Sequence, residues 1–514
     1  MNSIQTARRL VERLVGVGTT DAVLSPGSRS GPLALALHAA DAQGLLRLHV
    51  RVDEREAGFL ALGLATIQRR TVPVVTTSGT AVANLHPAML EALHTGVPVL
   101  AITADRPARL RGTGANQTTD QRDFFRGVPF LIDVDQLTPG RGPRHLNLEL
   151  DEPLVDVIEW RFVADDRLDV PEKATADVAV VDRLAGTVVM AGDGAGATAR
   201  ELAEAVGWPL LAEPTSGARG GSHAITTYRA LLRRPDLTDR IERVVSFGHA
   251  TLSRPVTALL ARDDIEIVHV GDQSTFPIPA GANVTFADAV RVDGSADPAW
   301  LEAWRSADAS AVSAIEAELD GTTAYDVART VDAAVPGGGL LVVGPSNPIR
   351  DLDLLGSAPD AARTVVGNRG LAGIDGMLST AIGSALAGSF TRAIAYVGDL
   401  TFLHGSNGLL IGPGEPRPDL TIVMVNDDGG SIFATLEQGA DDYADAFERV
   451  YATPTGADLA AVCAGFRIAH RQIAPGDLAT VLAEPPDGIE VIEVPVGRAG
   501  RRTLEARLMD VAES

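Results

Sequence analysis

Residues 393–430 read AIAYVGDLTFLHGSNGLLIGPGEPRPDLTIVMVNDDGG, and this stretch decides the fold class. Two apolar runs, at 393–398 and 420–425, each end in acidic residues and are separated by a segment long enough to cross back over a sheet. Apolar runs of this kind are typical of strands in a parallel sheet that helices cover on both faces. We therefore predict an α/β fold built from such sheets.

The acidic residues that follow the two runs indicate a metal site. Asp399 follows the first run and Asp427 the second, and in a parallel sheet both emerge at the carboxyl edge, where open α/β sheets bind ligands. Two carboxylates and the backbone oxygen of Gly429 suit Mg²⁺, with Mn²⁺ as an alternative. Amides at the start of the next helix, at Leu400 and Thr401, would face a phosphate. Alone, Asp399 would be interpreted as a helix cap, so the pair carries the prediction.

The same alternation of strand and helix occurs twice before residue 340. A polar stretch at 161–177 separates the first set of candidate strands from the second, and an Ala- and Asp-rich stretch at 293–323 leads out of the second. A chain of 514 residues is also too long for one hydrophobic core. We predict three domains, each a mostly parallel sheet flanked by helices, with the limits 1–172, 173–322 and 323–514.

The amino-acid composition limits the cellular compartment and the classes of binding partner that we expect. Lys and Arg total 44 against 67 Asp and Glu, so the net charge of −23 repels nucleic acid and anionic membranes. The single cysteine, Cys463, cannot form an internal disulfide, and the N-terminal residues show no signal peptide. We expect a cytoplasmic enzyme that binds neither nucleic acid nor membrane, with local arginines for any anionic substrate.

The spacing of GDL at 398–400 and ND at 426–427 resembles the Gly-Asp-Gly and Asn-Asn motif of thiamine-diphosphate-dependent enzymes. Leu400 replaces the usual Gly, and Asp427 replaces Asn as the second metal ligand. The resemblance implies that thiamine diphosphate binds here together with the metal. The residues it assigns to this end of the cofactor are Gly398, Asp399, Leu400, Thr401, Asp427, Gly429, Gly430 and Ile432.

Enzymes of this superfamily need a carboxylate against N1′ of the aminopyrimidine ring, and Glu54 is the candidate. It follows a candidate strand and opens an amphipathic helix, although a lone Glu there ordinarily complements the helix dipole. The resemblance further assigns Ser78 and Thr80 to the pyrimidine-side loop, and Ile374 to the apolar contact that bends the cofactor. Taken alone, Ile374 would be interpreted as a core residue.

A longer series of motifs narrows the resemblance. In order, they are SPGSRSGPLALAL (25–37), DEREAGFLALGLA (53–65), TSGTAVANLHPAMLEA (77–92), ITADRP (102–107), GANQTTDQ (114–121), HLNLELDEPL (145–154), NRGLAGIDGMLSTAIG (368–383) and VNDDGGSIF (425–433). Together they resemble the 2-succinyl-5-enolpyruvyl-6-hydroxy-3-cyclohexene-1-carboxylate synthase family of menaquinone biosynthesis. The resemblance implies decarboxylation of 2-oxoglutarate and 1,4-addition of the succinyl carbanion equivalent to isochorismate. It also implies a homo-oligomer, dimer or tetramer, with active sites at the subunit interface.

Both substrates carry two carboxylates, which arginines bind bidentately. The matching positions are Arg29, Arg106, Arg254, Arg350 and Arg369, with Ser28, Asn116, Gln117, Ser346, Ile432 and Phe433 as further substrate contacts. We assign catalytic roles to Glu54, Arg29, Arg106, Gln117, Arg350 and Arg369. Any one arginine alone would be interpreted as a surface or ion-pair residue. Ser253 stands where some relatives carry Lys, so one positive charge is missing beside Arg254.

Other interpretations stay open at this point. A different thiamine-dependent lyase or ligase, similar to acetolactate synthase or benzoylformate decarboxylase, is the nearest alternative. A catalytically inactive thiamine-binding protein is the second, and a flavin- or nucleotide-binding middle domain is the third. The Gly-rich turn at 192–196 follows a strand, but no acidic residue stands at the ribose-binding distance, so we interpret it as a close-packed turn without a cofactor.

Overall fold

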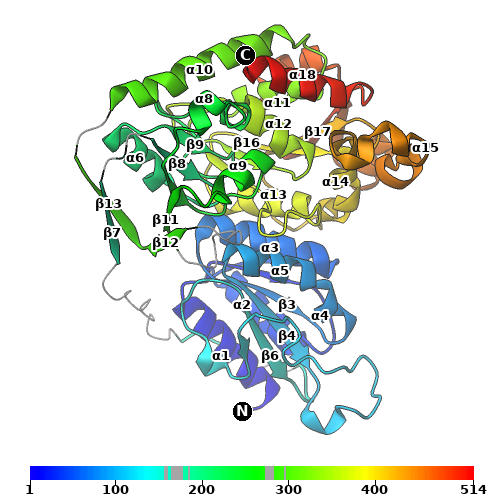
Figure 1. The fold of residues 1–514 in the computed structure, drawn as a ribbon. Helices are drawn as coiled ribbons and strands as arrows, with labels where there is room; N and C mark the ends of the chain where they lie inside the picture. Colours follow the sequence, from blue (N-terminus) through cyan, green and yellow to red (C-terminus); the bar gives the residue numbers. More distant parts are fainter. Residues whose placement is uncertain are drawn as a thin grey trace.

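Three parallel sheets, one after another along the chain, form the framework (Figure 1). The computed structural model describes residues 1–155, 160–163, 177–182, 184, 186–271, 283–294 and 297–513. Every strand pair within the three sheets is parallel, and helices connect the strands. The predicted α/β fold class is confirmed.

The first sheet has the strand order β2-β1-β3-β4-β6-β5. Side chains of β3 alternate between its two faces. Val74 packs under α3 and α5, whereas Val75 packs under α1 and α2. The elements are α1 (Ser3–Gly16), β1 (Asp21–Leu24), α2 (Gly31–Ala42), β2 (Arg47–Val50), α3 (Glu54–Gln68), β3 (Val72–Thr76), α4 (Thr80–Asn84), α5 (His86–Thr95), β4 (Val99–Asp105), β5 (Phe130–Leu131) and β6 (Arg144–Glu149).

The second sheet has the order β12-β11-β10-β8-β9 and is accompanied by a separate two-stranded ribbon of β7 and β13. The stretch predicted to lead out of this unit contains a long helix, α10, whose Trp300 and Trp304 are fully buried. The elements are β7 (Val178–Asp182), β8 (Thr187–Ala191), α6 (Ala197–Val206), β9 (Leu210–Ala212), α7 (Tyr228–Leu231), α8 (Pro235–Thr238), β10 (Arg243–Phe247), α9 (Arg254–Leu260), β11 (Glu266–Val270), β12 (Val284–Ala287), β13 (Ala289–Asp293) and α10 (Pro298–Ala317).

The third sheet has the order β15-β14-β16-β17-β19-β18. Its last helix, α18, turns back and packs on α10 of the second unit, where Leu508 and Met509 join the cluster around Trp304 (Figure 1). The elements are α11 (Ala324–Ala333), β14 (Leu340–Val343), α12 (Asn347–Leu355), β15 (Thr364–Val366), α13 (Met377–Ala387), β16 (Ala393–Gly398), α14 (Asp399–His404), β17 (Leu420–Asn426), α15 (Ala444–Phe447), α16 (Leu459–Gly465), β18 (Ala469–Gln472), α17 (Leu478–Leu482), β19 (Ile489–Pro495) and α18 (Arg501–Glu513).

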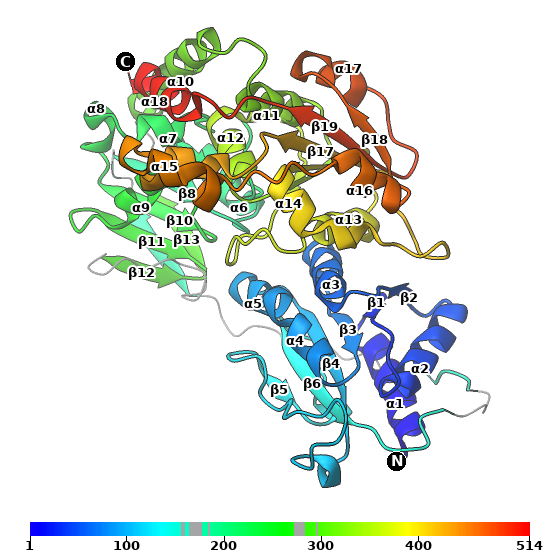
Figure 2. The same ribbon diagram turned by 90° about the vertical axis from the view of Figure 1, so that its right-hand side faces the viewer.

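Helices α3 and α13 join the first and third units (Figure 2). They approach so closely that a Cβ on Gly63 would lie 2.2 Å from the Thr380 carbonyl oxygen, and one on Gly383 would lie 2.4 Å from that of Leu60. The buried Glu56 carboxylate also accepts a 2.6 Å hydrogen bond from the Ser379 hydroxyl across this contact. The two units therefore share one continuous core.

The three predicted domains correspond to three sheets, but their limits stay predictions. The limit between residues 172 and 173 lies outside the described residues. The limit between 322 and 323 coincides with the start of α11, where Thr323 caps the helix and forms a capping box with Asp326. Among the described residues, no helix combines the length and the apolar character needed to cross a bilayer.

Candidate active site

The two predicted metal ligands lie side by side at the carboxyl edge of the third sheet. Gly398 of β16 pairs with Val425 of β17, so Asp399 and Asp427 leave the sheet at the same level. The Asp399 carboxylate accepts a 2.9 Å hydrogen bond from the Gly429 amide, which ties the two strand ends together. Burial, and then the negative charge of Asp427, raise the pKa of Asp399 to about 7.

This edge fits a divalent cation. Asp399 is buried and Asp427 is half-buried. Two such neighbouring carboxylates repel each other, and a cation between them removes that repulsion. Burial raises the pKa of Asp427 as well, although its hydrogen bond with Ser431 opposes the shift. Within the described residues, no group of three His, Cys, Asp or Glu side chains forms a metal cluster. A cation here would therefore combine two carboxylates with backbone and phosphate oxygens.

The turn after β17 is held by residues that the sequence analysis missed. Arg498 donates a 3.0 Å hydrogen bond to the carbonyl oxygen of Asp427 and a second to that of Asp428. Asp428 has a positive φ of 51°, and Gly429 is required because a Cβ there would lie 2.3 Å from the Ala452 carbonyl oxygen. Arg498 gives only a weak signal as a site residue in the sequence, because it lies far from Asp427 along the chain and outside any motif.

A side-chain relay orients Asp427 from the opposite side. Asn347, the first residue of α12, donates a 2.6 Å hydrogen bond to the Ser431 hydroxyl, which in turn is hydrogen-bonded to the Asp427 carboxyl. A cavity of about 300 Å³ adjoins Asp427 and Ser431 and is also lined by Arg498 and Arg501. Neither Asn347 nor Ser431 was predicted as a site residue, although both stand next to residues that were.

The remaining cofactor candidates of the third unit surround this turn. Thr401 is buried at the start of α14, and the Leu400 amide is hydrogen-bonded to the Asp399 carboxylate. Phe433 packs against Tyr451, with ring centroids 5.7 Å apart. The half-buried or buried candidates at this carboxyl edge are Ile374, Gly398, Leu400, Thr401, Gly430, Ile432 and Phe433.

Glu54 follows a strand and opens a helix, as predicted, and this places it at the carboxyl edge of the first sheet. It is the first residue of α3, directly after the N-cap Asp53, and it is half-buried. Its carboxylate accepts a 3.1 Å hydrogen bond from the Asn84 side chain at the end of α4. Asp53 in turn accepts a 3.0 Å bond from Asn407 of the third unit. The hydrogen bond from Asn84 thus holds the carboxylate at a defined place, and no ion pair joins it to another described residue.

Three predicted residues of the first unit form one hydrogen-bonded group. The Arg106 guanidinium donates to the Ser78 hydroxyl at 2.5 Å and to the Gln117 carbonyl oxygen at 2.7 Å. The Gln117 side chain returns a 3.1 Å bond to the Ser78 carbonyl oxygen, with the Gln117 backbone at a positive φ of 57°. A strained backbone held by several contacts is common at functional sites.

Arg29 belongs to the same edge. After burial, its positive charge is the largest cause of the lowered pKa of Arg106, so the two guanidinium groups lie close together. Arg29 donates a 3.0 Å hydrogen bond to the Leu150 carbonyl oxygen. Ser28, Thr80 and Asn116 are exposed on this edge. The structure brings two predicted cations together beside a polar, solvent-accessible surface, where anions are favoured.

Arg350 and Arg369 form a second pair on the third unit. Arg350 donates a 2.8 Å hydrogen bond to the carbonyl oxygen of Ser346, whose φ is +71°. Burial, and then the charge of Arg369, lower the pKa of Arg350. Arg369 is only 5% exposed, and its Nε finds no hydrogen-bond partner among the described residues. Arg254 differs from these, because it lies exposed at the start of α9 on the second unit.

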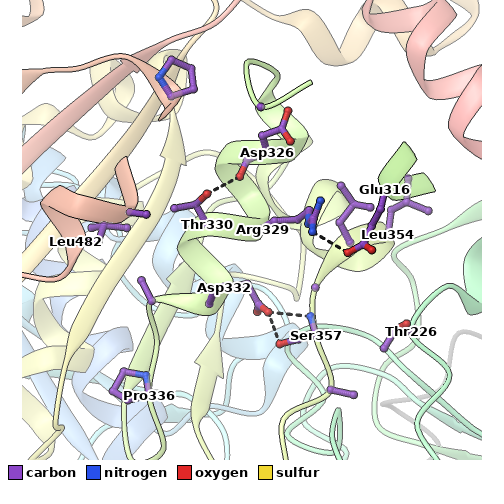
Figure 3. Close-up of a pocket in the computed structure, with 18 of the residues that line it drawn as sticks. Thr226, Glu316, Asp326, Arg329, Thr330, Asp332, Pro336, Leu354, Ser357 and Leu482 are labelled. Carbon is purple, nitrogen blue, oxygen red and sulfur yellow. Dashed lines mark hydrogen bonds and ion pairs between the residues drawn. The ribbon is translucent and has the colours of Figure 1, made fainter. Parts of the chain in front are cut away.

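A large cavity lies away from this site. It has a volume of about 1290 Å³ and lies at the opposite, amino edge of the third sheet, beside residues that precede β14 and β16 (Figure 3). One pair of charged groups in its wall is Arg329 and Glu316, which are joined by a 2.8 Å hydrogen bond. In the Gly-rich turn at 192–196, Gly192 is closely packed, because a Cβ there would lie 2.1 Å from the Ala250 nitrogen, whereas a Cβ on Gly194 or Gly196 would meet nothing within 4 Å.

Comparison with known proteins identifies the family. Residues 4–124 match the family described as thiamine pyrophosphate enzyme, N-terminal TPP binding domain. The chain is 52% identical to a 2-succinyl-5-enolpyruvyl-6-hydroxy-3-cyclohexene-1-carboxylate synthase of Nocardioides sp., over 98% of this chain and 97% of the relative. The chain belongs to this synthase family. Synthases of Kineococcus radiotolerans (46% identical) and Saccharopolyspora erythraea (42%) match over at least 96% of each chain.

Membership of the synthase family confirms the resemblance that the motifs indicated. It also identifies the first unit as a domain that binds thiamine diphosphate, another name for thiamine pyrophosphate. The match covers both carboxyl edges, including the pair Asp399 and Asp427 and the group around Arg106. The roles of the individual residues at these edges remain predictions.

Proposed function

We propose that this chain decarboxylates 2-oxoglutarate and adds the resulting succinyl unit to isochorismate in the 1,4-sense, using thiamine diphosphate and Mg²⁺. The product is then 2-succinyl-5-enolpyruvyl-6-hydroxy-3-cyclohexene-1-carboxylate, with release of CO₂, as a cytoplasmic step of menaquinone biosynthesis. Family membership supports the reaction. The observation that carries the site is the pair of carboxylates at one sheet edge, the buried Asp399 and the half-buried Asp427.

The residues of the third unit would hold the diphosphate end. Asp399, Asp427 and the Gly429 carbonyl oxygen would bind Mg²⁺, which prefers oxygen ligands in octahedral geometry and also binds phosphate oxygens. Mn²⁺ accepts the same ligands. Arg498 and the Asn347–Ser431 relay keep the turn in shape before the cation arrives. Less of the binding free energy is then needed to order the site.

The first unit would act on the pyrimidine end. When bound, thiamine diphosphate supplies a thiazolium carbon that attacks the 2-oxo group and takes up the electron pair left by CO₂. Glu54 would share a proton with N1′ of the aminopyrimidine ring, and its hydrogen bond from Asn84 fixes the carboxylate for that contact. Ser78 and Thr80 line the same edge, and Ile374 would supply the apolar contact that bends the cofactor.

Two pairs of arginines would bind the substrate carboxylates. Arg29 and Arg106 lie on the first unit, and Arg350 and Arg369 lie on the third. Guanidinium groups held close together repel each other, and a carboxylate between them relieves that repulsion. In a protein of net charge −23, these pairs would create the local positive potential that dianionic substrates require.

We further propose a homo-oligomer in which the first unit of one copy faces the third unit of another. Within one chain, α3 and α13 already join these two units along a buried interface. A second copy would bring the other pair of carboxyl edges together and enclose the reacting groups between chains.

Incubation of the protein with thiamine diphosphate, Mg²⁺, 2-oxoglutarate and isochorismate, followed by mass spectrometry, tests the proposal. We expect the mass of the adduct and one CO₂ for each adduct formed. Omitting isochorismate should remove the adduct and most of the CO₂. Production of acetolactate from pyruvate, or CO₂ without any adduct, would instead favour another thiamine-dependent lyase or ligase.

A further inference from the structure

Glu91 of α5 is a buried carboxylate at the junction of the first and third units. It is 4% exposed, and its two oxygens accept hydrogen bonds from consecutive backbone amides, Gly370 at 2.6 Å and Leu371 at 2.8 Å. These amides belong to the loop between β15 and α13, on the other unit. The Glu91 carboxylate therefore binds two backbone amides of a loop that belongs to the third unit.

The loop is closely fitted to α5 around this contact. A Cβ on Gly370 would lie 2.8 Å from the Glu91 carbonyl oxygen and 2.9 Å from the His94 Cβ, so only glycine allows the approach. Ala372 has a positive φ of 56°, and the Asn368 side chain donates to the Asp375 carbonyl oxygen at 3.3 Å. The shape of the loop is thus fixed by contacts at several points, with Glu91 as the charged one.

The same loop carries two residues of the candidate site. Arg369 directly precedes the first amide that Glu91 binds, and Ile374 lies three residues after the second. Removing the carboxylate would leave two part-buried amides without their acceptor, although Leu371 itself is exposed, and would empty the buried site that the Glu91 side chain fills. The loop would shift to find other acceptors, and both site residues would move with it.

We propose that Glu91 is a positioning residue for the reaction, which sets the loop that carries Arg369 and Ile374. The inference rests on the proposed function, because that function gives the two loop residues their roles. It also means that one first unit serves two active sites of the oligomer. Glu54 acts in the site shared with the partner subunit, whereas Glu91 shapes the loop of its own third unit.

The variants E91A and E91Q test this role, with D332N as the matched control. Asp332 is also a buried carboxylate that holds a loop, through the Ser357 amide at 2.8 Å and the Ser357 hydroxyl at 2.5 Å, but it lies beside the large cavity at the amino edge (Figure 3). The measurements are the Kd of thiamine diphosphate, the exchange rate of its C2 proton in the holoenzyme, and the KM of each substrate.

For E91A we expect cofactor Kd within about twofold of wild type, C2-proton exchange slowed about tenfold and the KM of one substrate raised about tenfold, since small displacements of positioning groups have effects of this size. E91Q should show a smaller change than E91A, because its side-chain amide oxygen can still accept one of the two hydrogen bonds. D332N should leave exchange and both KM values unchanged.

The possible results distinguish the positioning role of Glu91 from the proposed enzymatic function on which it rests. Wild-type exchange and wild-type KM values in a folded E91A protein would overturn the positioning role alone. If E91A does not fold, E91Q decides by the same measurements. A wild-type protein that binds the cofactor but shows no exchange of the C2 proton would contradict the proposed function itself, and the inference with it.

Discussion

Asp399 and Asp427 bring two negative charges together where water is largely excluded, so proton and metal compete for the same oxygens. The pKa of Asp399 is raised to about 7, first by burial and then by Asp427. Below pH 7 the metal-free protein therefore keeps a proton that the metal must displace. We expect Mn²⁺ affinity, titrated with thiamine diphosphate at pH 6, 7 and 8, to fall by up to about tenfold per pH unit below 7. A pH-independent Kd would contradict this.

The same shift affects the stability of the metal-free protein. Asp399 has a folded pKa above the unfolded value of 3.8, so the native state binds the extra proton between pH 4 and 7. This contribution to the free energy of unfolding is complete below the unfolded pKa and is lost as pH rises through about 7. Bound Mg²⁺ should then raise the melting temperature most above pH 7.

Arg106 is expected to act on substrate and not on cofactor activation. Its guanidinium contacts Ser78 and Gln117 and lies close to Arg29. We predict that R106A lowers kcat/KM by at least about a hundredfold, since hydrogen bonds to charged groups contribute several kcal/mol, while C2-proton exchange stays near the wild-type rate. Arg109 offers the control, because it forms an exposed ion pair with Asp151. Equal kcat/KM values for R106A and R109A would show that Arg106 is peripheral.

Site residues that lie in sequence motifs could be predicted, whereas the residues that hold those site residues in place could not. Asp399 and Asp427 each follow an apolar run, and the geometry of a parallel sheet is enough to bring them together. Arg498 reaches the same turn from beyond β19, and Glu91 reaches the loop of Arg369 from another unit. Contacts between distant parts of a chain depend on how the units pack, and a single sequence carries no local signal for that packing.

Helices α3 and α13 cross at very close range, and this contact constrains how the first and third units pack. Gly383 approaches the Leu60 carbonyl oxygen so closely that a Cβ would lie 2.4 Å from it. We predict that G383A destabilises the protein by about 2 kcal/mol, a typical cost of overpacking, despite the better helix propensity of alanine. Gly465 in α16 is the control, because a Cβ there would meet nothing within 4 Å. Equal melting temperatures for G383A and G465A would contradict the close crossing.

At the scale of the secondary-structure elements, the periodicity and the length of the apolar runs explain which strands could be predicted. The largely apolar strands β3, β16 and β17 stand out because both of their faces are buried. Helix α10 was missed because its Ala- and Asp-rich surface hides a narrow apolar stripe that includes Trp300 and Trp304. The return of α18 to the second unit could not be predicted either, since its apolar residues do not indicate which partner they cover.

At the scale of the whole molecule, the active site is expected to need two chains. Apart from Arg254, the candidate residues occupy the carboxyl edges of the first and third sheets, and we propose that these edges carry complementary parts of the chemistry. Glu54 would activate the cofactor from one copy, while Asp399 and Asp427 would hold its diphosphate in another. The second unit carries α9 with the candidate Arg254, and its helices α7 and α10 contact α18 of the third unit.

Mixing two inactive variants tests this central claim most directly. E54Q should bind Mg²⁺ and cofactor normally but turn over slower by orders of magnitude, and D399N should lose the metal. When the two are mixed under subunit-exchange conditions, each mixed dimer has one site with both intact residues, so we predict recovery of about a quarter of wild-type activity. If the mixture stays as inactive as either variant although mass spectrometry shows mixed dimers, Glu54 and Asp399 do not serve one site across the interface.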